Sequence, residues 1–110
     1  PVRGSKILIL GVAYKKNIDD IRESPAIPIM EDLLRKGADI VYSDHLIPEL
    51  KLKNIVLKSQ SLNSSLIKKM DCVVIITDHS NVDYRMIVKN AKLIFDTRNA
   101  VKEKRTQVIQ

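Results

Sequence analysis

The chain has 110 residues, 45% of them hydrophobic, which is enough for one domain with a buried core and too few for two. No apolar run approaches the roughly 20 residues that span a bilayer, and the first residues do not resemble a signal peptide, so we expect a cytosolic protein with no membrane partner. The net charge of +6 favours anionic partners or simply aids solubility, but three tyrosines and one phenylalanine are few for stacking on bases, so we expect no nucleic-acid partner.

The first part of the chain predicts a strand, a helix and a second strand. Residues 6–12 contain a continuous apolar run, typical of a strand covered on both faces, and Gly11 then allows a turn. Ser24 and Pro25 suit the first positions of a helix, and Gly37 suits its end. Residues 39–43 form the next strand, which we expect to lie parallel to the first through a right-handed crossover.

The second part predicts four further elements and one weakly marked edge strand. We expect that edge strand at 54–57, followed by a short helix that begins near Asn63. A strand at 72–77, a helix at 82–91 and a final strand at 93–96 complete the pattern. We treat 1–110 as one domain, with 1–5 as the end of a linker and 100–110 as a C-terminal tail or helix.

Polar residues follow the carboxyl end of each predicted parallel strand, and these ends meet at one edge of the sheet. They are Tyr14 and Lys15, then Asp44, then Thr77 to His79, then Asp96 to Arg98. Ligands of open α/β sheets bind at this edge. Lys15 suits a phosphate as a point charge, and Arg22 offers a planar fork for an anion. The plainer alternative is a solvated loop whose charges pair among themselves.

Several common sites are excluded. Glycines occur only at 4, 11 and 37, so neither the glycine-rich dinucleotide fingerprint nor the phosphate-binding P-loop is present. Cys72 is the only cysteine and lies in a predicted buried strand, which favours a core residue over a nucleophile. Asp78 and His79 are better read as a helix cap and a polar rim residue than as a general-base pair. We therefore expect no catalytic residue and no metal site.

Three segments resemble a known family. GVAYKKNIDDIRESP at 11–25, VVIITDH at 73–79 and IFDTRN at 94–99 are similar to the C-terminal domain of the UDP-glucose/GDP-mannose dehydrogenases. The resemblance implies a three-layer α/β/α Rossmann-like fold with a parallel sheet of about five strands in the order 3-2-1-4-5. Within the family, the sequences of residues 76–84 and 95–99 most resemble those of the UDP-N-acetyl-hexosamine 6-dehydrogenases.

The resemblance also implies a function. Such enzymes oxidise the C6 hydroxyl of UDP-glucose, UDP-N-acetylglucosamine or a related sugar to a carboxylate, using NAD, for surface polysaccharide synthesis. By similarity, Tyr14, Lys15 and Arg98 contact the UDP-sugar and Arg22 approaches the NAD. The NAD domain, the catalytic cysteine and the dimer helix lie upstream in the family, so this chain alone should be inactive, whereas the full enzyme should be a homodimer or larger.

The basic charge then serves to attract and orient the diphosphate at the strand-end crevice. Two other hypotheses stay open at this point. One is a nucleic-acid-binding α/β module, which would use the basic residues at 102–105 and the helix faces. The other is a stand-alone domain that senses a nucleotide with the same fold.

Overall fold

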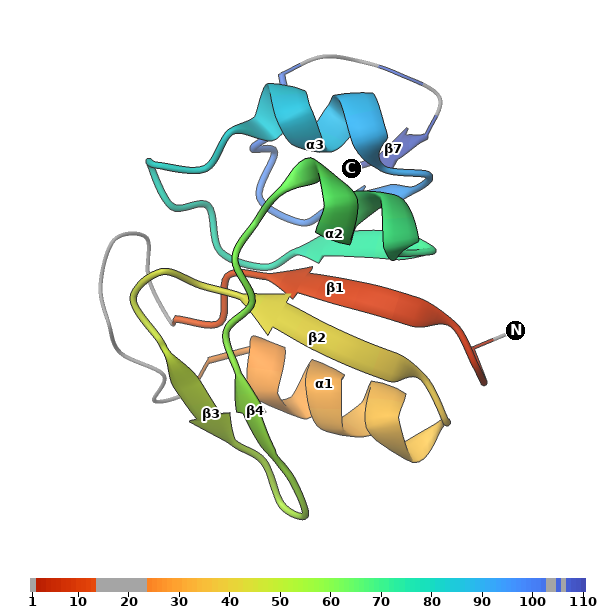
Figure 1. The fold of residues 1–110 in the computed structure, drawn as a ribbon, viewed down its shortest axis with the longest axis vertical. Helices are drawn as coiled ribbons and strands as arrows, with labels where there is room; N and C mark the ends of the chain where they lie inside the picture. Colours follow the sequence, from red (N-terminus) through yellow and green to blue (C-terminus); the bar gives the residue numbers. More distant parts are fainter. Residues whose placement is uncertain (1, 14–23, 103–104, 106) are drawn as a thin grey trace.

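The computed structural model describes residues 2–13, 24–102, 105 and 107–110. Figure 1 shows a sheet with helices on both sides. In chain order the elements are β1 (Lys6–Leu10), α1 (Ala26–Arg35), β2 (Asp39–Ser43), β3 (Glu49–Lys51), β4 (Val56–Lys58), α2 (Ser64–Lys69), β5 (Cys72–Ile75), α3 (Tyr84–Asn90), β6 (Ile94–Asp96) and β7 (Val108–Ile109).

The main sheet has five parallel strands in the order β2-β1-β5-β6-β7. The connection from β1 to β2 passes through α1, and the connection from β5 to β6 passes through α3, as expected for parallel neighbours. The predicted Rossmann-like α/β fold is therefore confirmed, and the four main strands occupy the places expected of strands 2-1-4-5. The observed order agrees roughly with the expected one and differs from it only at the two edges.

At both edges the observed pairing differs from the expected one. The predicted edge strand at 54–57 is observed as β4, which pairs with β3 in an antiparallel hairpin instead of extending the main sheet. A tight turn closes this hairpin, with the Leu52 amide donating to the Ile55 carbonyl at 2.9 Å. At the opposite edge, where the sequence suggested a tail or a helix, β7 pairs with β6.

Two hydrophobic clusters lie on the two faces of the sheet. Alternation along β1 sends Ile7 and Ile9 to the face covered by α1, and Leu8 and Leu10 to the face covered by α2 and α3. All four side chains are buried, which explains why the run is continuously apolar and not alternating.

The ends of the helices follow the sequence signals closely. Gly37, at φ +90°, ends α1, and the amides of Gly37 and Ala38 donate to the carbonyls of Leu34 and Leu33, a Schellman arrangement. Asn63 caps α2 and Asp83 caps α3 through side-chain oxygens. Helix α1 begins at Ala26, one residue later than predicted. Within the described ranges, no helix combines the length and apolar character needed to cross a membrane.

Candidate functional site

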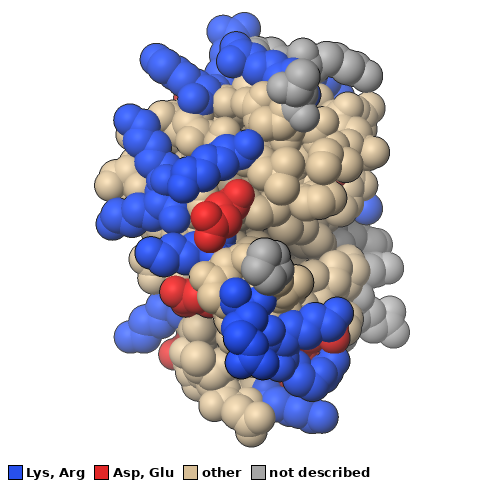
Figure 2. Space-filling view, turned by 90° about the vertical axis from the view of Figure 1, so that its right-hand side faces the viewer, with Lys and Arg blue, Asp and Glu red and all other residues tan. Residues whose placement is uncertain are grey.

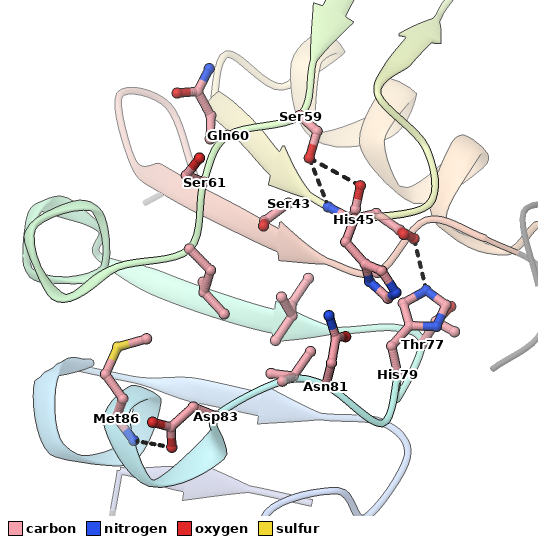
Figure 3. A pocket seen from close by; sticks show the side chains of 15 residues that line it. Ser43, His45, Ser59, Gln60, Ser61, Thr77, His79, Asn81, Asp83 and Met86 are labelled. Carbon is pink, nitrogen blue, oxygen red and sulfur yellow. Dashed lines mark hydrogen bonds and ion pairs between the residues drawn. The ribbon is translucent and has the colours of Figure 1, made fainter. Parts of the chain in front are cut away.

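A pocket of about 400 Å³ opens at the carboxyl edge of the sheet, where β1, β2 and β5 end. The chain leaves β1 for β2 on one side and reaches β5 on the other, so the strand order reverses at this point, which is where open α/β sheets bind ligands. Figure 3 shows polar side chains such as Ser59, Gln60 and Asn81 around the pocket. Its described lining comes from residues 10–11, 43–45, 59–62, 77, 79, 81–83 and 86.

Gly11 makes the close approach between the ends of β1 and β5 possible. Its φ is +80°, and a Cβ at this position would lie 2.4 Å from the carbonyl oxygen of Thr77. No side chain fits that space or readily adopts that φ, so glycine is required where the chain leaves β1.

Asp44, at the end of β2, organises the floor of the pocket. Its Oδ2 accepts hydrogen bonds from the amides of Val12 at 2.8 Å and Ala13 at 3.0 Å, and its Oδ1 accepts one from the Leu46 amide at 2.9 Å. Burial on its own raises the pKa of Asp44, but these bonds and one from His79 outweigh burial and lower that pKa below its ordinary value. Asp44 is therefore a buried carboxylate with its charge satisfied by donors.

His79 is the side-chain partner of this carboxylate. Its Nε2 lies 3.0 Å from Asp44 Oδ2, and because an ionised carboxylate only accepts, Nε2 is the donor. The ring is 2% exposed and meets His45 edge-on, with 5.1 Å between the ring centroids. The prediction that His79 is a polar rim residue is wrong, because the pairing with Asp44 draws it into the interior.

Asp78 also differs from its predicted role. The cap of α3 is Asp83, whereas Asp78 Oδ1 accepts a hydrogen bond from the Tyr84 hydroxyl at 2.8 Å. Burial and this bond raise the pKa of Tyr84. Asp78 and His79 therefore have separate partners and do not form a general-base pair.

Two buried hydroxyls hold the chain that leaves β1. Ser24 Oγ donates to the Val12 carbonyl at 2.6 Å and accepts from the Ala26 amide at 3.2 Å. Thr77 Oγ1 donates to the Ala13 carbonyl at 2.6 Å. Pro25 and not the predicted Ser24 occupies the N-cap position of α1, and Ser24 instead ties the start of α1 to the end of β1.

Asp96 performs a similar task at the end of β6. Its carboxylate accepts from the amides of Arg98, Ala100 and Val101 and from the Gln110 side chain, at 2.7–3.1 Å. Burial opposes ionisation of Asp96, but these donors lower its pKa overall. The loop that carries Arg98 is therefore fixed by its own strand end.

The structure describes one of the four predicted ligand residues. Arg98 is exposed and lines a separate open hollow of about 550 Å³, together with Thr97, Asn99 and Gln110. Tyr14, Lys15 and Arg22 lie outside the described residues. Of the four predicted ligand residues, only Arg98 therefore lies in the described part of the chain, together with the residues on either side of 14–23.

Many of the described lysines and arginines lie at the opposite edge of the sheet. Figure 2 shows lysines and arginines crowded on the face that holds the amino ends of the strands. These residues come from the ends of the helices and the segments that lead into strands, where the helix dipole favours cations: Arg3, Lys6, Arg35, Lys36, Lys68, Lys69, Lys89 and Lys92.

The described lining of the carboxyl-edge pocket includes no lysine or arginine. Of the basic residues expected to serve the ligand edge, Lys15 and Arg22 lie outside the described residues, and many of the other charges lie at helix ends at the other edge.

Cys72 and the acidic residues add no chemistry of their own. Burial raises the pKa of the Cys72 thiol, which disfavours the reactive thiolate. Across the described ranges, no three His, Cys, Asp or Glu side chains lie close enough together to hold a metal ion. What the edge offers is binding geometry: fixed backbone, hydroxyls and amides around a pocket.

The sequence alone missed the buried pair of Asp44 and His79. Both residues were placed at the ligand edge by the order of the strands, but they are 35 positions apart and no periodic pattern joins them. The available signal was a carboxylate directly after one buried strand and a histidine two residues after another.

Fold and site together define a Rossmann-like α/β domain with a ligand-binding edge at its strand switch point. The chain belongs to the UDP-glucose/GDP-mannose dehydrogenase family: the sequence model of that family's UDP binding domain matches residues 8–103.

Known relatives agree with this assignment. The chain is 33% identical over 109 residues to a UDP-glucose 6-dehydrogenase of Rickettsia bellii, covering 92% of this chain and 25% of that protein. It is 33% identical over 103 residues to a UDP-N-acetyl-D-mannosamine dehydrogenase of Methanocaldococcus jannaschii, covering 86% and 22%. The structure of the UDP-N-acetyl-mannosamine dehydrogenase Cap5O from S. aureus matches with a TM-score of 0.70 and 32% identity, covering 96% and 25%. The chain thus spans about a quarter of the length of these relatives.

Proposed function

We propose that the chain is the UDP-sugar-binding C-terminal domain of a longer, NAD-dependent UDP-sugar 6-dehydrogenase of the cytoplasm. That enzyme oxidises the C6 hydroxyl to a carboxylate and supplies uronic acids for surface polysaccharides. The observation that supports this most is the match to the family's UDP binding domain over residues 8–103, because this range includes both the 14–23 loop and the 97–99 loop.

In this proposal Tyr14, Lys15 and Arg98 contact the UDP-sugar. Lysine and arginine give charge-assisted hydrogen bonds to a diphosphate, and a tyrosine ring packs on a sugar or base. The fixed backbone on both loops supports the assignment: the amide of Arg98 is bound by Asp96, and the residues before Tyr14 are bound by Asp44. These loops follow β6 and β1, two strands of the same parallel sheet.

NAD does not find a complete site in this chain. The turn after β1 contains the single glycine Gly11, so the usual backbone cradle for a pyrophosphate is missing. We propose that upstream parts of the enzyme bind the dinucleotide, supply the catalytic cysteine and form the homodimer, and that Arg22 alone reaches NAD from this domain. In the full enzyme, Arg22→Ala should raise KM for NAD and leave KM for the sugar nucleotide unchanged.

The sugar itself is the finer part of the proposal. The relatives named above act, by their names, on UDP-glucose or on UDP-N-acetyl-D-mannosamine, at the same 33% identity. The amino-acid sequence of residues 76–84 and 95–99 favours an N-acetyl-hexosamine as the sugar of the substrate. Comparing kcat/KM of the full enzyme for UDP-glucose, UDP-N-acetylglucosamine and UDP-N-acetylmannosamine decides between them.

The proposed site is tested by calorimetric titration of UDP into this chain and two charge-matched variants. Lys15→Ala removes a proposed phosphate contact and should weaken UDP binding by about tenfold or more, the usual value of a charge-assisted hydrogen bond. Lys68→Ala removes the same charge from the opposite edge and should leave the affinity unchanged. Equal affinities in all three proteins would refute the site.

A nucleic-acid-binding module is the weaker alternative. The observation that favoured it was the net positive charge. Many of the basic residues on the face in Figure 2 lie at helix ends, where the helix dipole already accounts for them. Titrating a short RNA under the same conditions separates the two functions, because backbone binding of nucleic acid falls steeply with salt. A stand-alone nucleotide sensor would bind UDP in the same way but would need no upstream dehydrogenase segment.

A further inference from the structure

We infer that Ser24, Asp44 and Thr77 are positioning residues for the UDP-sugar: they fix the backbone of Val12 and Ala13, the two residues that lead directly into the proposed ligand pair. The inference rests on the proposed function, since it assigns these three side chains a role in binding through Tyr14 and Lys15.

The two residues Val12 and Ala13 are held at every polar backbone atom by side chains. Both amides donate to one oxygen of Asp44, at 2.8 and 3.0 Å. The Val12 carbonyl accepts from Ser24 Oγ and the Ala13 carbonyl accepts from Thr77 Oγ1, each at 2.6 Å. Three side chains, which we call the backbone clamp, thus bind all four polar backbone atoms of this dipeptide.

The members of the backbone clamp come from three separate parts of the fold. Asp44 follows β2, Ser24 precedes α1, and Thr77 follows β5. Each of these residues is 3% exposed, and Val12 and Ala13 are fully buried. Hydrogen bonds shielded from water in this way are stronger and more rigid than exposed ones. The clamp therefore ties the exit of β1 to both neighbouring strands and to the helix at the far end of the 14–23 loop.

Asp44 is itself held firmly. Its Oδ1 accepts a hydrogen bond from the Leu46 amide, and its Oδ2 accepts one from His79. Its backbone amide donates to Ser59 Oγ at 2.9 Å. The Ser59 hydroxyl also donates to the Asp44 carbonyl at 3.1 Å, as Figure 3 shows. A carboxylate with this many partners has one orientation, which it imposes on the two amides it binds.

Such rigidity matters for binding because a ligand contact is weakened when its residue must first be ordered or is displaced. Thr77 holds the carbonyl of Ala13, the last described residue before the proposed ligand pair. A clamp that served stability alone would have no effect on UDP affinity once the protein is fully folded. Affinity measured well below the melting temperature therefore separates the two roles.

The test compares Thr77→Val with Thr77→Ser in the 110-residue chain. Valine keeps the volume and removes the hydroxyl, whereas serine keeps the hydroxyl. We expect the UDP dissociation constant, measured calorimetrically, to rise about three- to tenfold in Thr77→Val and to return close to the original value in Thr77→Ser. If the valine variant does not fold, Ser24→Ala provides the same comparison at the Val12 carbonyl.

A double-mutant cycle shows whether the effect passes through the loop. In a Lys15→Ala background, Thr77→Val should have little further effect on UDP affinity, because the contact that it positions is already gone. In the full enzyme, Thr77→Val should raise KM for the UDP-sugar more than KM for NAD. Fully additive effects, or an unchanged UDP affinity in a folded Thr77→Val protein, would overturn the inference.

The outcome also separates this inference from the proposed function. If Lys15→Ala weakens UDP binding and Thr77→Val does not, the site stands and the positioning role fails. If the original chain does not bind UDP, or if Lys15→Ala binds it normally, the proposed site fails and the positioning role fails with it.

Discussion

Replacing Asp44 with asparagine should destabilise the domain strongly, and more at neutral than at acid pH. The side chain is buried, and its two oxygens accept from three amides and from His79. An asparagine can keep its oxygen toward the donors at Oδ2, but its amide group then faces the Leu46 amide, donor against donor. The variant thus loses one acceptor completely and the negative charge on the remaining bonds.

The expected loss follows from these bonds. An unsatisfied buried donor costs about 1–3 kcal/mol, and each of the three bonds that remain at Oδ2 loses about 1 kcal/mol with the charge, which gives a total of about 4–6 kcal/mol for Asp44→Asn. In a domain of this size that loss lowers the melting temperature by roughly 15 °C or more. It is a large part of the stability of a small domain, about 5–15 kcal/mol.

The pH dependence has a definite sign. The pKa of Asp44 in the folded protein is lowered, so its stabilising effect is complete above the unfolded-state pKa, about 3.9, and is lost as the pH falls through the folded-state value. Asparagine does not titrate. The difference in stability between the two proteins should therefore be full at pH 7 and smaller at pH 3.

Urea unfolding followed by circular dichroism at pH 7, 5 and 3 measures this difference directly. The control is Asp32→Asn, which removes an exposed carboxylate that pairs with Arg35 and Lys36 at the end of α1 and should leave the unfolding midpoint almost unchanged. A difference below about 1 kcal/mol for Asp44→Asn at pH 7, or one that is the same at pH 3, would refute this view of the buried carboxylate.

Three further outcomes are expected. Gly11→Ala should lower the free energy of unfolding, measured in urea, by at least about 3 kcal/mol, because Gly11 has a positive φ and lies close to the chain that follows β5. Gly4→Ala, at a similar φ but in open space, should lower it by about 1–2 kcal/mol, and equal losses would contradict the steric reason. Cys72 should react with a disulfide reagent at pH 8 more slowly than a free thiol, because burial raises its pKa; a fast reaction would contradict this. Asp96→Asn should speed hydrogen exchange in the loop after β6, at the Ala100 amide, and leave exchange in β1 unchanged.

Local signals in the sequence were sufficient for the central elements. The apolar run in β1 and the segment of β2 predicted both strands, and Gly37 marked the end of α1 because its positive φ suits the Schellman arrangement. The ligand edge followed from topology, since parallel strands place their carboxyl ends together. These features depend on short-range chemistry or on a general rule about sheets.

The parts that the sequence did not predict depend on contacts between distant segments. Strand β7 has two residues and exists only because β6 offers an open edge. Strand β4 was recognised near its place, but its pairing with β3 depended on a turn that left no strong mark. The union of Asp44 with His79 required the tertiary structure, because either side chain alone is equally suited to a polar rim.

A residue-resolved NMR titration of this chain with UDP tests the central claim most directly. The account predicts saturable shifts at the carboxyl edge, at the amides of Val12 and Ala13 and through the 97–99 loop, with none on the basic face around Lys68. Shifts confined to that basic face, or no saturable shift with UDP, would contradict the assignment of this edge as the UDP-sugar site.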